Sequence, residues 1–597
     1  MPFLLTLLLV LAVHLPTAWA AWTQVGLLAD DRHMVGAAVL RHRGQWSFGS
    51  MWVPEGAAGA DAATALYRPF VDLGFWLEAP WFGTTAFGYH VTNSVLHCAT
   101  ALVWFVLVRR RSGSIAAGLA CALLFAGWPS HGEATHWIAA RTNVQSTFLF
   151  SAALLVFDAA LARRAGALRR VGIAAAALLA TAAVGTKESA VFVLPLAACL
   201  AWQHSAGGSW RARAGAAAVA VAPVVGAVLA WLAWRTHLLG TWGSGTHYGW
   251  LAARIGPRVC LDWLELLFAP RHRSYTAAPW TPVLWLLHGA LLAAVVRAAF
   301  APAARGIAAL GATLLVCGFL AGIGLETMDP ATLENARYAY EPVLGLCVLA
   351  GIAIAALPTR ARGASLAVLV LVHAIVLDGN RTSWLRAAAV YQRLEHDTFE
   401  IARATQQPIR VLQAPGVYEG AFALLNGYTE TLFLTETAPP GTNLRGQVSS
   451  AQEWRATLQE LAVAAAARRA PTNTFTVRWD DGALAPFELD ARWPQGGIGY
   501  AWIARERPFV GSTAPVHVLW LGGPAVTLAV VAHRGERTWR SADVAVAASG
   551  EPQAVELVLP LPGDLDADVP VPVELHVRSG DAVSVMPLGV TVPSRRW

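Results

Sequence analysis

Long apolar segments recur along the first two-thirds of this chain, and shorter segments rich in charged and polar residues separate them. Each apolar segment is about as long as a helix that crosses a lipid bilayer. The pattern predicts eleven membrane-spanning helices, near 1–22, 91–108, 114–128, 144–162, 171–185, 189–203, 214–234, 280–296, 306–325, 342–358 and 363–378.

The connections between these segments differ in charge. Five of them, 109–114, 163–170, 203–213, 297–305 and 359–363, contain thirteen Arg and no Asp or Glu. The positive-inside rule places such connections in the cytoplasm. The alternate connections, 21–90, 129–142, 186–188, 235–280 and 326–341, hold fourteen of the sixteen carboxylates that precede residue 381 and are predicted to lie outside. Eleven spans with an inside N-terminus then place residues 381–597 outside as well, in the periplasm of a bacterium.

The first apolar segment has two interpretations. Residues 1–20 end in Ala18-Trp19-Ala20, which resembles the cleavage site of a signal peptide. A signal peptide normally begins with positive charge, but the first basic residue here other than His is Arg32. We therefore expect a retained span.

Residues 381–597 differ in composition from the preceding part of the chain: the share of charged residues is higher, and there is no cysteine. A polar helical connector is expected over 381–410. Segments 474–479, 516–520, 525–532, 554–559 and 571–577 have the length and β-branched content of strands and are separated by Gly and Pro. The predicted fold is a polytopic α-helical membrane core over 1–380, with about eleven transmembrane helices, followed by a soluble β-rich (α+β) domain over 411–597.

Composition supports this class and excludes others. Hydrophobic residues make up 56% of the 597 residues and charged residues only 14%, which excludes a soluble enzyme. The formal charge of +6 is distributed between apolar segments rather than along one face, so topology explains it better than nucleic-acid binding. The six cysteines show no CxxC spacing, and no disulfide framework or zinc ribbon is predicted.

Candidate chemistry begins directly after the first apolar segment, at Asp30-Asp31. Adjacent carboxylates at a membrane surface can abstract a proton from an acceptor hydroxyl or hold a divalent cation. An ordinary solvated acidic loop is the alternative interpretation.

The second outer connection contains His131, Glu133 and His136. A zinc-protease motif requires histidines four residues apart with Glu next to the first, and these are five apart, so that motif is rejected. We expect instead a short helix that presents Glu133, Trp137 and Arg141 on one face.

Two later connections contain candidate phosphate-binding cations. Lys187 is the only lysine in the chain, against 43 Arg, and its position at a membrane boundary indicates that an ammonium group is needed there. Arg337 precedes the tenth span, where a guanidinium can bind phosphate in a bidentate manner. Chance retention of Lys187 and an interfacial Arg-Tyr belt at Arg337 are the alternatives.

A carboxylate base together with phosphate-binding cations favours sugar transfer from a lipid phosphate. Proton relays and transporters usually place polar residues in the middle of their spans, and here the middles of the apolar segments are almost free of charge.

These motifs, in this order, resemble a known family. The chain is similar to the membrane core of polytopic glycosyltransferases of the GT-C superfamily, in particular the transmembrane O-mannosyltransferase-like proteins that often carry tetratricopeptide repeats. The resemblance covers about residues 1–410. It depends on Asp30-Asp31, Tyr67-Arg68-Pro69-Phe70, the segment 87–93 with His97, then Pro129, His131, Glu133, Trp137 and Arg141, then Lys187-Glu188, and finally the segment 337–342.

The resemblance implies an inverting transferase that takes a sugar from a polyprenyl-phosphate donor. Asp30 is then the general base and Asp31 its support, with a divalent cation at this pair if any metal takes part. The implied donor-phosphate ligands are Lys187, Arg141 and Arg337, and the implied cavity-lining residues are Arg68, His90, Asn93, His131, Glu133, Trp137, Glu188 and Tyr338. The implied location is the inner membrane of a bacterium, with a role in protein glycosylation or the cell envelope.

The resemblance leaves the acceptor open. In relatives a helix similar to 384–405 leads into repeats, but here a β-rich domain follows it, so a protein, a glycan or a lipid acceptor is compatible with the sequence. A translocase for the lipid-linked sugar, without transferase chemistry, is the alternative function. A non-catalytic scaffold whose β-rich domain recruits partners is a third.

Overall fold

The computed structural model describes residues 2–52, 67–205, 209–240, 257–299, 304–322, 329–405, 409–412, 417–418, 421–422, 475–480, 483–486, 498–503, 513–548, 553–562, 565 and 571–591. The chain divides into two compact units. The membrane unit comprises residues 1–392 and 416–434, and the β unit comprises 393–415 and 435–597. Segments 53–66, 241–256 and 326–328 of the predicted outer connections lie outside the described residues.

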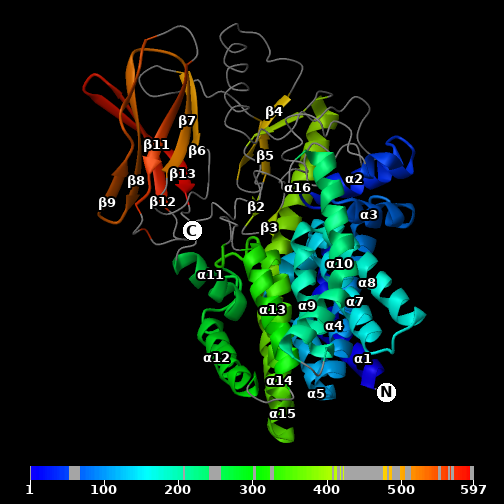
Figure 1. Ribbon diagram of the computed structural model, residues 1–597. Coiled ribbons are helices and arrows are strands. Elements are labelled where there is room, and N and C mark those ends of the chain that lie inside the picture. Colours follow the sequence, from blue (N-terminus) through cyan, green and yellow to red (C-terminus); the bar gives the residue numbers. More distant parts are fainter. Residues whose placement is uncertain are drawn as a thin grey trace. The chain divides into compact units, whose positions relative to one another are not determined.

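The membrane unit is built from helices (Figure 1). The α-helices are α1 (Pro2–Gln24), α2 (Asp31–His42), α3 (Pro69–Phe82), α4 (Ala86–Ser112), α5 (Ile115–Ala126), α6 (Gly132–His136), α7 (Arg141–Leu161), α8 (Ala167–Thr186), α9 (Val193–His204), α10 (Trp210–Leu239), α11 (Pro257–Phe268), α12 (Trp280–Ala299), α13 (Arg305–Gly322), α14 (Tyr340–Ala355), α15 (Thr359–Asn380) and α16 (Thr382–Thr405), the last of which extends into the β unit. Short 3₁₀ helices are η1 (Phe48–Met51), η3 (Pro129–His131), η4 (Ile138–Ala140), η5 (Glu188–Phe192) and η7 (Ala336–Ala339).

The prediction of a polytopic helical membrane protein is confirmed. Among the described residues, nine helices are long and apolar enough to cross a membrane, and a tenth crossing is formed if α5 and the bent segment 129–136 are counted as one span. The predicted span at 189–203 is absent from this set, because α9 has only 12 residues.

Helix α9 nevertheless returns the chain across the bundle. Together with η5 it covers 188–204, a length of roughly 28 Å, close to the hydrocarbon thickness of a bilayer. Its last residues reach the end of the bundle opposite Lys187, where Gln203 accepts a hydrogen bond of 2.9 Å from Arg111 and donates one of 2.7 Å to the Gly306 carbonyl. In the described chain η5 and α9 together therefore account for the predicted span at 189–203, although α9 by itself is too short to cross a membrane.

At one end of the bundle a single carboxylate joins three helices. Asp158, at the end of α7, bonds Arg110 at 2.9 Å, Arg111 at 3.4 Å and His204 at 3.0 Å. These contacts join α4, α7 and α9 at their predicted cytoplasmic ends. We call this side the Arg-rich end, and the opposite side, where Asp31, Glu133 and Lys187 lie, the acidic end.

Helix α14 is the central helix of the bundle and is buried along nearly its whole length. It packs closely because it presents glycines to its neighbours: a Cβ on Gly345 would lie 2.5 Å from the Leu315 backbone nitrogen of α13, and one on Gly351 would lie 2.4 Å from the Ala117 carbonyl of α5. Small residues allow such close backbone approach inside membranes. The first turn of α14 is thereby fixed at the acidic end of the bundle.

The β-rich character predicted for the C-terminal region is confirmed, and the structure arranges most of the described strands as two packed sheets. One sheet has the order β10-β8-β12-β13, with β9 also paired to β8, and a second has the order β11-β7-β6. Alternate residues of β7, β8, β11 and β12 form one apolar core between these sheets. The strands are β6 (Ile498–Ile503), β7 (Thr513–Gly522), β8 (Val526–Arg534), β9 (Arg537–Arg540), β10 (Val544–Val546), β11 (Gln553–Pro560), β12 (Val571–Ser579) and β13 (Ala582–Thr591).

Smaller pairings complete the described strands. The parallel pair β1 (Ile409–Leu412) and β4 (Phe475–Asp480) is extended by β5 (Ala483–Pro486), and β2 (Val417–Tyr418) pairs with β3 (Ala421–Phe422). The predicted strands at 474–479, 516–520, 525–532, 554–559 and 571–577 correspond to β4, β7, β8, β11 and β12.

Candidate active site at the acidic end of the bundle

The two adjacent aspartates have different surroundings. Asp31 is fully buried at the start of α2, and its two carboxylate oxygens accept hydrogen bonds from the backbone N–H groups of Leu28, at 2.9 Å, and Ala139, at 2.6 Å. Asp30 is half-buried and stands at the N-cap of α2, but its side chain does not cap that helix. Asp31 therefore fixes the backbone, while part of Asp30 is accessible to solvent.

The backbone before the pair is strained. Ala29 has φ +46°, in the left-handed region, which a non-glycine residue adopts at a cost of about 1–3 kcal/mol. Two side chains hold the backbone of this turn in place. Trp137 donates to the Leu28 carbonyl at 3.3 Å, and His90 Nε2 lies 3.0 Å from the Val25 carbonyl. Strain that is held in this way is typical of functional sites.

Burial raises the pKa of Asp31 to about 8, with a smaller raising effect from Asp30 and a lowering effect from the backbone donors. Because the pKa in the folded state exceeds the unfolded value, the stabilising contribution is complete below about pH 4 and is lost as the pH rises through about 8. In detergent, the unfolding free energy of wild type relative to Asp31→Asn should fall over this window, by up to about 1.4 kcal/mol per pH unit.

Thermal unfolding followed from pH 4 to pH 9 measures this difference. The matched control is Asp378→Asn, which removes a carboxylate whose side chain is 61% accessible and which therefore lacks the burial of Asp31. Parallel curves for wild type and Asp31→Asn would contradict the raised pKa.

The segment 132–141 joins the aspartates to the cations. It is not the single helix predicted from the sequence: α6 ends at His136, Trp137 adopts an extended conformation, and α7 begins at Arg141. Glu133 and Trp137 still meet at one guanidinium, because Glu133 forms an ion pair with Arg337 and the Trp137 ring lies 5.0 Å from it. The predicted grouping of these two residues with Arg141 is wrong. The helix is interrupted at Trp137, and the Arg141 side chain bonds Asn93, Glu78 and Tyr89 instead.

Three cations distant in sequence converge on Tyr338. The Arg337 guanidinium lies 4.7 Å and the Lys187 ammonium 5.0 Å from its ring, and Arg68 acts electrostatically on the same side chain. We call Arg68, Lys187 and Arg337 the cation cluster. Arg68, Tyr338 and Arg337 are each partly exposed, whereas Lys187 is buried.

Each member of the cation cluster also has a carboxylate partner. Arg337 pairs with Glu133, Lys187 with Glu341 at 3.5 Å, and Arg68 with Glu188 at 2.9 Å. Glu188 has a second cation, Arg235 of α10, at 3.3 Å. In these described ion pairs four cations face three carboxylates, so the seven side chains together carry one excess positive charge when all are ionised.

Arg141 and Asn93 form a separate, buried group. The Arg141 guanidinium is 0% exposed and donates to Asn93 Oδ1 at 2.6 Å, Glu78 at 2.6 Å and the Tyr89 carbonyl at 2.8 Å. Asn93 in turn donates to the carbonyls of Trp137 and Ile138, at 3.4 and 3.3 Å. We infer that both residues position the segment 132–141 and that Arg141 does not hold the donor phosphate.

Replacing Arg141 with lysine tests this inference. A lysine cannot reproduce three directional contacts and would leave buried acceptors unpaired, so a loss of about 3–5 kcal/mol is expected. The folded fraction should use donor with nearly the wild-type KM. Thermal unfolding measures the loss of stability, and transfer rates over a range of donor concentrations measure the KM. The exposed Arg297 allows a matched Arg297→Lys control. A stable Arg141→Lys protein with a greatly raised KM would instead assign Arg141 to the phosphate.

His131 lies apart from the cation cluster in its described contacts. Its ring packs against His97, Phe125 and Tyr340, with centroid separations of 5.3, 4.8 and 4.7 Å, and it is 1% exposed. Tyr340 donates to His97 Nδ1 at 2.7 Å. This aromatic layer supports the start of α14, next to which Arg337 and Tyr338 lie.

Three charged residues of this region were missing from the predicted set of site residues. They are the carboxylate partners Glu341 and Glu78 and the second cation at Glu188, Arg235. Each stands beside or within an apolar segment, where an idle charge is costly, and that position was the available signal.

These features define a polytopic helical membrane protein with a charged, partly accessible site at one end of the bundle and an appended β unit. In sequence it is similar to the protein O-mannosyl-transferase Tmtc1 of Drosophila melanogaster, with 30% identity over 179 residues. This match confirms the resemblance to membrane O-mannosyltransferases. It covers 29% of the chain and about a fifth, 20%, of the relative.

Two solved structures are similar over most of the chain. ArnT from Cupriavidus metallidurans, bound to undecaprenyl phosphate, aligns with a TM-score of 0.47 and 13% identity over 79% of this chain and 93% of that one. The oligosaccharyltransferase AglB from Archaeoglobus fulgidus, in complex with an inhibitory peptide and a dolichol-phosphate, aligns with a TM-score of 0.42 and 10% identity over 100% and 98%. No family model matches the chain.

Proposed function

We propose that this protein is a membrane glycosyltransferase that transfers a sugar from a polyprenyl-phosphate donor to an acceptor hydroxyl, with inversion at the anomeric carbon. One observation carries the proposal: the segment 132–141 joins the cation cluster, through Glu133 and Trp137, to the aspartate pair, through Ala139. One short segment thus connects the proposed phosphate site with the proposed general base.

The excess positive charge suits the leaving group. A polyprenyl-phosphate sugar is a phosphodiester with one negative charge, and the released phosphate monoester carries about −1.5 to −2 at neutral pH. Cations fixed in place before the reaction stabilise the charge that develops on the departing oxygen more than they stabilise the donor. The cation cluster therefore supports bond cleavage as well as binding.

In the proposed step the acceptor oxygen attacks the anomeric carbon on the face opposite the phosphate. The new C–O bond forms as the bond from the anomeric carbon to the phosphate oxygen breaks, and that electron pair leaves with the polyprenyl phosphate. Asp30 takes the proton from the acceptor hydroxyl. Asp31, held by Leu28 and Ala139, fixes the position of Asp30.

The aspartate pair does not fit a resident metal ion. Both carboxylate oxygens of Asp31 already accept backbone hydrogen bonds in a fully buried setting, and its only described carboxylate neighbour is Asp30. The proposed step accordingly uses no metal at this pair.

The proposed orientation follows from charge. With the Arg-rich end in the cytoplasm, the aspartate pair and the cation cluster lie at the opposite, non-cytoplasmic face of the membrane. In the inner membrane of a bacterium this face is the periplasmic one. An acceptor protein is the substrate class indicated by the name of the Drosophila relative. Glycan and lipid acceptors are tested beside it.

Purified protein in liposomes, incubated with a panel of polyprenyl-phosphate sugars and each acceptor class, tests the proposal. Release of free polyprenyl phosphate, matched by glycosylated acceptor, is the expected result. Movement of labelled donor across the bilayer without product would identify a translocase instead. Neither release nor movement by folded protein would favour the scaffold.

A further inference from the structure

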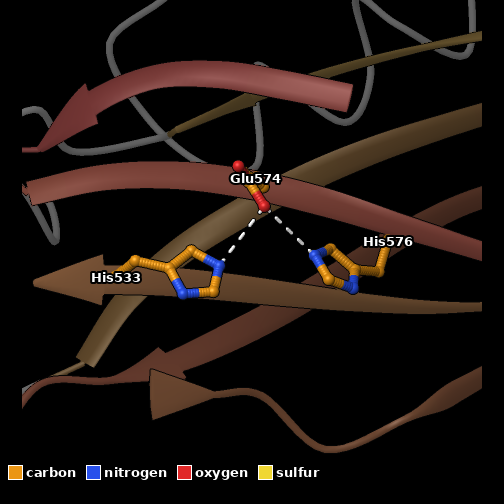
Figure 2. A group of neighbouring side chains, drawn as sticks. All are labelled: His533, Glu574 and His576. Carbon is orange, nitrogen blue, oxygen red and sulfur yellow. Dashed lines mark hydrogen bonds and ion pairs between the residues drawn. The ribbon is translucent and has the colours of Figure 1, made fainter. Parts of the chain in front are cut away.

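The β unit carries a cluster of potential metal ligands that the proposed transfer reaction does not use. His533 lies on β8, and Glu574 and His576 lie on the neighbouring strand β12 (Figure 2). In the part of the chain that the structure describes, this is the one group of three or more His, Cys, Asp or Glu residues whose ligand atoms all lie within 4.8 Å of one another.

Strand register brings the three side chains together on the outer face of the sheet. Val573, Leu575 and Val577 of β12 point into the apolar core, so Glu574 and His576 point away from it. Glu574 is opposite Val531, and His533, two residues further along β8, is therefore its diagonal neighbour on the same face. The cluster is a product of antiparallel pairing and uses no core position.

The spacing of the ligand atoms matches a small coordination sphere. The Glu574 carboxylate lies 3.3 Å from His533 Nε2 and 3.2 Å from His576 Nε2, and Figure 2 shows both rings turned toward it. Ligands about 2.0–2.1 Å from a tetrahedral Zn²⁺ are roughly 3.4 Å apart. The two distances to Glu574 match this spacing, and all three ligand atoms lie within 4.8 Å of one another, so a small rearrangement would let them surround a metal ion.

A fourth residue orients one ligand. The other ring nitrogen of His533 lies 3.2 Å from the Thr538 hydroxyl on β9. When His533 Nδ1–H donates to that hydroxyl, Nε2 keeps its lone pair and faces Glu574. Second partners of this kind fix the tautomer and direction of metal-binding histidines.

We propose that His533, Glu574 and His576 bind a divalent transition metal, with Zn²⁺ as the reference ion. Two imidazoles and one carboxylate are a common ligand set for this ion. The side chains are 41%, 33% and 20% exposed, so a further coordination position is open to water or to a ligand from a partner.

Calorimetric titration of the full-length protein with Zn²⁺, after removal of any polyhistidine tag, tests the proposal. One equivalent is expected to bind at pH 7.5, and binding should weaken at pH 5.5 because the histidines must be deprotonated. The double variant His533→Ala/His576→Ala should lose this equivalent. His396→Ala, which removes an exposed histidine of α16, should retain it.

Two further variants separate metal binding from folding. Thr538→Val leaves all three ligands in place and should weaken binding about 10–100-fold. Glu574→Gln keeps the size of the side chain but removes its charge, and should weaken binding as well. Co²⁺ bound to wild type should give the intense visible absorption of a four-coordinate site. Unchanged Zn²⁺ binding by the double variant, or no binding by folded wild type, would show that the three residues form only a hydrogen-bonded surface group.

Discussion

Replacing Asp30 with asparagine is expected to slow sugar transfer by about 10²–10⁴-fold while the amount of protein in the membrane stays at the wild-type level. Asparagine has the same shape but cannot accept the acceptor's proton. The fold should survive, because Asp30 does not cap α2 and the turn is held by Asp31 and Trp137. The loss should appear in kcat, with little change in the KM for donor.

The rate of polyprenyl phosphate release, compared between wild type and Asp30→Asn, measures this effect. Asp378→Asn serves as the matched control, since it removes an exposed carboxylate whose described ion pair is with Arg381. Transfer by Asp30→Asn at more than a tenth of the wild-type rate would remove Asp30 from the role of general base.

The second large effect is expected at Lys187. Lys187→Met leaves the buried Glu341 carboxyl group without its cation, and breaking a buried ion pair in this way costs about 3–5 kcal/mol of stability. It also removes one fixed charge from the cation cluster, for which a loss of about 10²–10³-fold in kcat is typical. Loss of activity by this variant alone therefore does not distinguish a folding defect from a catalytic one.

The double variant Lys187→Met/Glu341→Gln separates the two causes. Neutralising both partners removes the unpaired buried charge, so thermal stability should return to near the wild-type value. Transfer should stay low, because the positive charge beside Tyr338 is still missing. Recovery of transfer together with stability would show that Lys187 serves only to pair Glu341.

The β unit offers a different comparison of sequence with structure. The length and β-branched content of the segments, with Gly and Pro between them, were sufficient to locate β7, β8, β11 and β12. They do not reveal that His533 is a diagonal neighbour of Glu574, because that depends on which strands pair and in which register. Residues about 40 apart in sequence were brought together by the sheet.

The membrane unit shows the same limit at its site. Each motif could be identified alone, but the pairs Lys187–Glu341, Arg68–Glu188 and Arg337–Glu133 join residues 154, 120 and 204 positions apart in sequence. The expected helix through Glu133, Trp137 and Arg141 failed because tertiary contacts override local periodicity: Trp137 bonds the Leu28 carbonyl, and Arg141 bonds Asn93, Glu78 and Tyr89.

The sequence by itself determined the membrane class, the approximate positions of the spans, the alternation of Arg-rich and acidic connections and the existence of a β-rich C-terminal region. These properties depend on local hydrophobicity and charge, which each segment carries independently of the others. Only the tertiary structure decided that the predicted span at 189–203 is divided between η5 and α9, that Asp31 is a buried anchor while Asp30 is partly accessible, and that three cations meet at Tyr338. Those outcomes depend on packing between helices that are far apart in sequence, such as the close approach of α14 to α13 at Gly345 and to α5 at Gly351, which local hydrophobicity does not specify.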